Sequence, residues 1–362
     1  MFNDIYRGKR VLVTGSTGFK GSWLCAWLQM LGSEVCGIAL EPETSPAHYP
    51  LLNLKMRQEI CDIRNREKMQ EIFSSFQPEI VFHLAAQPLV RLSYRIPAET
   101  FEVNVMGTVN VLEVCRNTPQ LRAIVAVTSD KCYENKEQLS GYRESDPMGG
   151  HDPYSSSKGC SELVINSYRR SFFSPSEYGK SHRVLLASGR AGNVIGGGDW
   201  AQDRLIPDMV KAAAAGVPAG IRNPHATRPW QHVLEPLSGY LLLGAELFQG
   251  NRAVAAPWNF GPDESGVTDV KTAVEMMQKK WHEITFFINE DPGAVHEAKL
   301  LQLNCTRAAE LLAWHGVLRA EEMFEFTARW YRKFYRENKV VTFEQLEKYI
   351  ALAEERGLKW SK

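Results

Sequence analysis

The feature that most constrains this chain is a short apolar strand that runs directly into a glycine-rich turn. Val11–Val13 suits a buried parallel strand, and TGSTGFKG follows it without a spacer. Gly15 allows a tight turn, Gly18 lets the backbone approach a pyrophosphate, and Gly21 lets the next helix pack closely. A glycine-rich loop without a ligand is the alternative. The position between a strand and an apolar-faced helix favours a dinucleotide site.

Composition excludes several other classes of protein. The 362 residues, 44% of them hydrophobic, can form one large domain or two ordinary ones. Forty-two basic residues balance 42 acidic ones, so no global charge indicates a nucleic acid or a membrane as partner. Seven cysteines without a CxxC pair, and nine histidines without HxH or HExxH spacing, predict neither disulfides nor a metal site. No apolar run approaches the roughly 20 residues that span a bilayer, and we expect a cytoplasmic protein.

Strand and helix patterns alternate through the first half of the chain. This alternation predicts an α/β, Rossmann-type, doubly wound parallel sheet, with residues 1–190 as the dinucleotide-binding domain. The expected strands after the first are 34–40, 57–61, 80–83, 121–127 and 183–188, and the expected helices are 19–31, 67–76 and 97–116.

The second half of the chain is expected to form most of the substrate side. Residues 191–362 are predicted to be mainly a smaller, mostly helical substrate-binding lobe, interleaved with the first domain because 225–260 partly returns to it. Short strands at 230–234 and 258–260 are expected to rejoin the main sheet. Helices are expected at about 205–214, 234–249, 268–280, 306–313, 321–337 and 342–355.

The residue that would hold the adenosine ribose is missing or displaced. A dinucleotide fold carries an acidic residue roughly 20 residues beyond the glycines, at the end of the second strand. Here Ala39 holds that place, and Glu41 is followed by Pro42, where the chain turns away. No arginine stands nearby to receive a 2′-phosphate, which favours NAD over NADP.

The segments that follow other strands carry small side chains and candidate catalytic groups. Leu84-Ala85-Ala86-Gln87 follows the fourth strand, where small residues let a flat cofactor lie close, although a plain connecting loop is an alternative. Tyr154 and Lys158, four residues apart, lie on one helix face, so the ammonium can favour the phenolate and create a general base. Tyr and Lys at this spacing are also common on surfaces. The upstream Ser129 at a strand end strengthens the functional interpretation.

Taken together, these motifs resemble the extended short-chain dehydrogenase/reductase family over most of the chain. The matching segments are TGSTGFKG, DI at 62–63, HLAAQ at 83–87, NVMGT at 104–108, VTSDK at 127–131, YSSSK at 154–158 and RAGNVIG at 190–196. The resemblance implies NAD as cofactor and Ser129, Tyr154 and Lys158 as the hydride-transfer triad. It implies cofactor contacts from Gly15, Gly18, Phe19, Gly21, Asp62, Ile63, Leu84, Ala85, Ala86, Gln87, Tyr154 and Lys158.

Asp130-Lys131 narrows the resemblance to sugar-nucleotide 4,6-dehydratases, which carry an acidic residue after the Ser/Thr. With GFKG and RPWQHV at 228–233, the chain is similar to members that act on CDP-glucose. The implied reaction has Tyr154 taking the C4 hydroxyl proton, and Asp130 and Lys131 serving the loss of water across C5 and C6. Which of the two is the acid stays open, because neighbouring groups can share one proton. Asp130 and Lys131 as a solvated pair, a 4-epimerase, and a non-catalytic NAD sensor are the alternatives.

Substrate contacts and assembly are expected from the remaining matches. Arginine offers a planar donor fork to a pyrophosphate, although each arginine alone is more often a surface charge. His232 is equally compatible with a ligand contact and with a buried histidine. The family implies a homodimer, or a dimer of dimers, through helices at about 98–116 and 154–172, and a place in deoxysugar and lipopolysaccharide O-antigen biosynthesis. The expected substrate contacts are Asn193, Arg204, Arg228 and His232.

Overall fold

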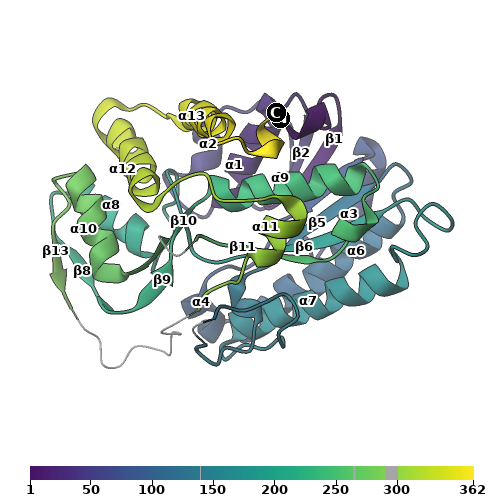
Figure 1. Cartoon of the computed structure of the whole chain (residues 1–362), viewed down its shortest axis with the longest axis horizontal. Coiled ribbons are helices and arrows are strands. Elements are labelled where there is room, and N and C mark those ends of the chain that lie inside the picture. The colour runs from purple at the N-terminus through teal and green to yellow at the C-terminus, as the bar shows by residue number, and fades with distance from the viewer. Residues whose placement is uncertain (139, 264–265, 290–300) are drawn as a thin grey trace.

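Seven parallel strands form the central layer of the fold (Figure 1). The computed structural model describes residues 1–138, 140–263, 266–289 and 301–362. Each neighbouring pair in the sheet is parallel, as the strand–helix alternation predicts. The order across the sheet is β11 (Pro257–Phe260), β6 (Leu185–Ala191), β5 (Ala123–Val127), β4 (Ile80–His83), β1 (Arg10–Thr14), β2 (Glu34–Ala39) and β3 (Arg57–Ile60).

Helices cover both faces of this sheet because its side chains alternate between two apolar cores. Val11 and Val13 of β1 face one core, while Leu12 between them faces the other. Figure 1 shows the two helical layers on opposite sides of the strands. The first core is covered by α1 (Phe19–Met30), α9 (Leu234–Phe248) and α13 (Thr342–Glu355), and the second by α3 (Arg66–Phe76), α6 (Gly107–Arg116) and α7 (Pro153–Ser171).

Most predicted elements of the first half are present, with shifted ends. The expected strand 183–188 begins at Leu185 and continues to Ala191, so Arg190 lies inside the sheet. The predicted helix at 97–116 is α5 (Pro97–Phe101) and α6 joined by a π-helical segment, η2 (Glu102–Met106). Short elements that the sequence reading omitted are η1 (Phe2–Asp4), α2 (His48–Leu51), α4 (Val90–Arg95) and η3 (Asp130–Cys132).

A smaller lobe stands beside the carboxyl ends of the strands. Its helices match the predicted ranges closely, and its strands form two-stranded sheets, β8 with β13 and β9 with β12. Its elements are α8 (Leu205–Ala214), β8 (Ala219–Ile221), β9 (Thr227–Pro229), β12 (Val267–Asp269), α10 (Val270–Lys280) and β13 (Phe286–Ile288). The chain then continues through α11 (Thr306–Leu312) and α12 (Ala320–Glu337), and two further 3-10 turns among the described residues are η4 (Arg252–Val254) and η6 (Lys359–Ser361).

Two predictions about the C-terminal half are wrong. The strand expected at 230–234 is β10 (Gln231–His232), which pairs with β7 (Val194–Ile195) rather than with the main sheet. The expected return at 258–260 is present, as β11 beside β6. The helix at 342–355 packs on α1 instead of building the lobe, whereas the helix at 234–248 packs on β5 and β6, within the segment 225–260 that was expected to return partly to the first domain. The reason is visible in α9, which is buried on nearly every side, as a helix that is apolar all round must be.

Candidate active site

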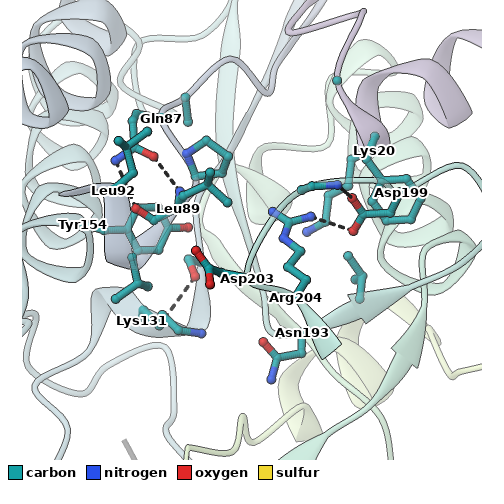
Figure 2. Close-up of a pocket in the computed structure, with 18 of the residues that line it drawn as sticks. Lys20, Gln87, Leu89, Leu92, Lys131, Tyr154, Asn193, Asp199, Asp203 and Arg204 are labelled. Atoms are coloured by element: carbon teal, nitrogen blue, oxygen red, sulfur yellow. Dashed lines mark hydrogen bonds and ion pairs between the residues drawn. The ribbon is translucent and has the colours of Figure 1, made fainter. Parts of the chain in front are cut away.

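A cavity of about 1360 Å³ lies where the carboxyl ends of the strands face the smaller lobe. Parallel sheets place ligands at this edge, because the loops that follow the strands diverge there. The turn after β1, the ends of β4 and β5, the start of α7 and the segment before α8 all contribute to its wall. Figure 2 shows side chains from both sides pointing into it.

The glycine turn after β1 has the shape that its sequence predicts. Gly15 has φ +76°, and a side chain there would meet the backbone of Ala85 at 2.8 Å. A side chain at Gly21 would meet the carbonyl oxygen of Gly15 at 2.0 Å. No side chain caps the N-terminus of α1, so its first N–H groups are left to face an anion. Gly15, Gly18, Phe19 and Gly21 all line the cavity.

A buried polar network fixes the loop after β4. The Thr14 hydroxyl accepts from the backbone N–H groups of Leu84 and Ala85, at 3.1 and 3.2 Å, so its own proton goes to His83 Nδ1 at 2.7 Å. His83 Nε2 then donates to Thr108 Oγ1 at 3.1 Å. Burial lowers the pKa of His83 to about 3, which keeps the ring neutral in this tautomer. Leu84, Ala85, Ala86 and Gln87 therefore lie along the cavity wall.

The end of the cavity near β2 has no carboxylate at the expected position. Ala39 ends the strand, and the carbonyl of Leu40 accepts from Thr17 Oγ1 at 2.8 Å. Asp62, after β3, is held by Arg64 at 2.7 Å, and this contact lowers the pKa of the Asp62 carboxyl. Glu41, Asp62 and Ile63 line the cavity. The acidic residue that usually receives the ribose is thus absent from its usual strand end.

Three consecutive residues at the end of β5 gather the polar groups for chemistry. Ser129 caps η3, and its hydroxyl donates to Asp130 Oδ1 at 2.8 Å while accepting from the Lys131 N–H at 3.2 Å. Lys131 Nζ lies 3.5 Å from the same carboxylate oxygen. The Asp130 side chain is 2% exposed and that of Lys131 27% exposed. The pair is therefore not a solvated surface pair.

Tyr154 is brought to this strand end by the start of α7. Asp152 caps the helix by accepting from the Ser155 N–H at 2.9 Å. Pro153 occupies the first helical position, where its missing N–H costs no hydrogen bond. Burial raises the pKa of Tyr154 to about 12, and a hydrogen bond from Ser129 opposes the rise. Because the Ser129 hydroxyl has one proton, it can donate to only one of its two neighbours, Asp130 or Tyr154, at a time.

Lys158 lies one turn further along α7, on the same face. Burial lowers its pKa to about 8, and the nearby Glu162 carboxylate opposes that change. The largest charge effects on the Tyr154 pKa come from Asp130 and Arg204 rather than from Lys158. Arg204 is thus the protein cation with the largest effect in favour of the Tyr154 phenolate.

Lys20 lines the cavity, although its place in the GFKG segment did not predict a role for it. It lies in the first turn of α1, and Figure 2 shows it beside Asp199 and Arg204. Burial lowers the pKa of Lys20 to about 7. The positive charges of Arg204, Lys158 and Lys131 lower this pKa further, and the negative charge of Asp130 raises it. A lysine among so many cations is suited to a site that receives an anion.

The predicted substrate residues do not all reach the cavity. Asn193, Arg204 and Arg228 line it, and Arg204 Nη1 is held by Asp199 Oδ2 at 2.8 Å (Figure 2). His232 does not line it: the ring is fully buried between Trp23 and Phe326. The histidine is part of the core because β10 pairs with β7 beneath the lobe. It is therefore not a substrate contact.

An ion-pair bridge across the cavity was missed from sequence. Asp203, just before Arg204, lies 3.6 Å from Arg91 of α4 and 3.3 Å from Arg222 beyond β8. Arg91 lies more than 100 positions before Asp203 in the chain, Arg222 lies 19 positions after it, and the three residues share no motif. Only the folded arrangement brings them together.

The described ranges contain neither a metal-binding cluster nor a membrane-spanning helix. Within residues 1–138, 140–263, 266–289 and 301–362 there is no group of three or more His, Cys, Asp and Glu side chains placed to hold a metal ion. In the same ranges, no helix is both long enough and apolar enough to cross a bilayer.

Comparison with known proteins decides the family. Residues 11–254 match the model of the NAD dependent epimerase/dehydratase family. The chain belongs to this family. Its members in the short-chain dehydrogenase/reductase class use NAD, and the glycine turn fits that cofactor: side chains at Gly15 or Gly21 would collide with the backbone of Ala85 or Gly15 and force the turn open. NAD is the cofactor of this chain, and the chain is an enzyme.

Individual relatives place the chain more closely within the family. It is 47% identical over 335 residues to CDP-glucose 4,6-dehydratase of Salmonella typhimurium, covering 92% of this chain and 93% of that one. The fold matches an epimerase of Methanothermobacter thermautotrophicus, with a TM-score of 0.77 at 22% identity, covering 96% of this chain and 97% of that one. It also matches UDP-glucose 4-epimerase of Thermus thermophilus in complex with NAD, with a TM-score of 0.75 at 21% identity, covering 89% and 99%.

Proposed function

We propose that this protein is a nucleotide-sugar 4,6-dehydratase that converts CDP-glucose to CDP-4-keto-6-deoxyglucose and water. The observation that carries the proposal is the Asp130–Lys131 pair, with 3.5 Å between Lys131 Nζ and Asp130 Oδ1, directly after Ser129 in the NAD-binding cavity. An epimerase needs the C4 oxidation but no acid or base for C5 and C6. CDP-glucose as the substrate is supported by the 47% identity to the Salmonella typhimurium enzyme.

The residues divide into an oxidation set and an elimination set. Tyr154 takes the proton of the C4 hydroxyl, Ser129 hydrogen-bonds the same oxygen, and Lys158 holds the cofactor and favours the phenolate. NAD, held by Lys158 and the glycine turn, would supply the hydride acceptor for C4 and the hydride donor for C6. Burial raises the pKa of the Tyr154 phenol to about 12. Tyr154 therefore becomes an effective base only when positive charges close to it, such as that of Lys158, favour the phenolate.

Elimination needs a base at C5 and an acid at C6. The C4 ketone acidifies the C5–H bond, so a neutral Lys131 can remove that proton while a protonated Asp130 donates to the departing C6 hydroxyl. Asp130 accepts from Ser129 and lies 3.5 Å from Lys131 Nζ, so transfer of one proton from the Lys131 ammonium to the Asp130 carboxylate supplies both the base and the acid. Asn193, Arg204 and Arg228 are the groups we assign to the nucleotide diphosphate.

The division of the chain follows from these roles. Residues 1–190, with part of 225–260, hold NAD, and residues 191–362 mainly hold the substrate. The enzyme works as a homodimer in the cytoplasm, supplying a deoxysugar precursor of lipopolysaccharide O-antigen. Support for the dimer comes from two exposed apolar side chains on neighbouring helical segments, Met106 (51% exposed) and Leu163 (59% exposed).

Product identification tests the proposal. Purified enzyme with NAD and CDP-glucose should give the 4-keto-6-deoxy sugar, seen by NMR as a new C6 methyl signal. The dTDP- and GDP-linked sugars, assayed in parallel, should react more slowly. Formation of the C4 epimer without a methyl signal would establish the epimerase instead, and no conversion of any sugar would favour a non-catalytic NAD-binding protein.

A further inference from the structure

A buried carboxylate, Glu162, joins the catalytic helix to the strand end that carries Ser129. It lies one turn beyond Lys158 on α7, and its side chain is 3% exposed. Glu162 Oε1 accepts from Thr128 Oγ1 at 2.5 Å, and Oε2 accepts from Ser188 Oγ at 3.0 Å and Arg190 Nη2 at 2.7 Å. One side chain thus ties α7 to both β5 and β6.

The contacts continue beyond Glu162 to the segment behind the cavity. Arg190 Nη1 donates to the Tyr133 hydroxyl at 2.7 Å, and that hydroxyl donates to Asn259 Oδ1 of β11 at 2.7 Å. Tyr133 follows η3 directly, so both ends of the Ser129–Lys131 segment are fixed through this network. A buried carboxylate satisfied by three donors keeps its negative charge, and its pKa is correspondingly low.

Lys158 depends on that negative charge. The titratable and charged groups that interact with Lys158 come from four elements: Glu162 on α7, Cys132 in η3, His83 at the end of β4 and Lys20 in α1. His83 is neutral, and burial keeps Cys132 a neutral thiol by raising its pKa well above the ordinary value. Glu162 is therefore the anion that offsets the burial of the Lys158 ammonium.

We propose that Glu162 is a positioning residue that keeps Lys158 protonated at neutral pH and fixes the end of β5 through Thr128. It touches neither sugar nor cofactor, since it does not line the cavity. Its role in the reaction rests on the proposed function, in which Lys158 serves hydride transfer. The effect of Glu162 on the charge of Lys158 is independent of the proposed function.

The test measures Lys158 directly in cofactor-free protein. Competitive acetylation with acetic anhydride, followed by mass spectrometry across pH, gives the protonation midpoint of this lysine. The wild-type midpoint should lie near pH 8. In Glu162→Gln it should fall by about one unit or more, because an opposite charge has been removed, and in the double variant Glu162→Gln/Arg190→Gln it should fall less, because the like charge of Arg190 is removed as well.

The double variant guards against simple misfolding. Removing Glu162 alone leaves a buried Arg190 without its partner, which is costly, whereas the double variant removes both charges. Glu235→Gln is the matched control, because Glu235 is equally buried but accepts from Val317, Leu318 and Tyr349 outside the cavity. It should leave the Lys158 midpoint unchanged.

Activity supplies the second readout. With NAD and CDP-glucose at pH 7.5, Glu162→Gln should form NADH about threefold more slowly or worse, because a midpoint one unit lower reduces the protonated fraction of Lys158 by about that factor. A folded Glu162→Gln variant with the wild-type Lys158 midpoint would overturn the inference, as would a wild-type midpoint below pH 7. Wild-type enzyme that forms no NADH would contradict the proposed function instead, and the acetylation result would still decide the role of Glu162.

Discussion

Lys131 Nζ lies 3.5 Å from Asp130 Oδ1, at the carboxyl end of β5 and beside the hydroxyl of Ser129. An acid and a base next to the group that hydrogen-bonds the substrate oxygen are what a dehydration adds to an oxidation. The same cavity holds the glycine turn and Tyr154. Oxidation and elimination can therefore take place without moving the sugar.

The missing ribose carboxylate gives the first prediction. Ala39 ends β2 where an acidic residue usually binds the adenosine ribose, so NAD should bind weakly and purified enzyme should need added NAD. Ala39→Asp should tighten NAD binding by roughly tenfold to a hundredfold, the worth of a charge-assisted hydrogen bond. Calorimetry on cofactor-free protein measures this. Stoichiometric NAD retained through purification of the wild type would contradict it.

Lys20 gives a prediction with a defined pH dependence. Its pKa is about 7 in the folded protein against an ordinary value of 10.5, and a bound pyrophosphate would raise it again. NAD affinity should therefore fall as pH rises from about 7, because binding then requires proton uptake. Lys20→Met should bind NAD more weakly at pH 6.5 and lose this pH dependence.

Lys20→Met should also stabilise the cofactor-free protein. Burying an ammonium costs stability, and because the folded pKa is lowered, the cost is complete below about pH 7 and disappears above about 10.5. Thermal unfolding of cofactor-free Lys20→Met should thus show a higher Tm than the wild type at pH 7. Equal Tm values with equal NAD affinities would exclude a charged Lys20 that is partly buried.

The proposed dimer is tested on its apolar surface. Met106→Glu combined with Leu163→Lys places charges where two copies should meet, so light scattering at micromolar concentration should shift from dimer to monomer mass. Leu311→Lys on α11 is the control, since Leu311 is 69% exposed and lies on another element. A wild-type protein that is already monomeric would remove the proposal.

What could be predicted from the sequence was local. The glycine turn, the Ser129–Lys131 segment and the Tyr154–Lys158 spacing are each short patterns on one element, and the structure places all three in one cavity. The parallel sheet was predictable for the same reason, because each strand and helix carries its own periodicity.

What was missed depends on long-range contacts. The role of Glu162 depends on its contact with Arg190, 28 residues away, and that of Asp203 on its contact with Arg91. Neither pair forms a local sequence motif. His232 was open between ligand contact and core because a single buried histidine has no pattern. The helix at 234–248 was assigned to the lobe because an apolar helix does not reveal which surface it covers.

The most direct test of the account is the fate of hydride in Lys131→Met. Oxidation at C4 needs Tyr154, Ser129 and NAD, whereas loss of water needs proton transfer at C5 and C6, and removing a positioned acid or base typically costs about 10²–10⁴-fold. Nicotinamide absorbance after mixing with NAD and CDP-glucose should therefore show bound NADH accumulating in Lys131→Met and none in Tyr154→Phe. Product formation by Lys131→Met at the wild-type rate, without accumulated NADH, would contradict the account.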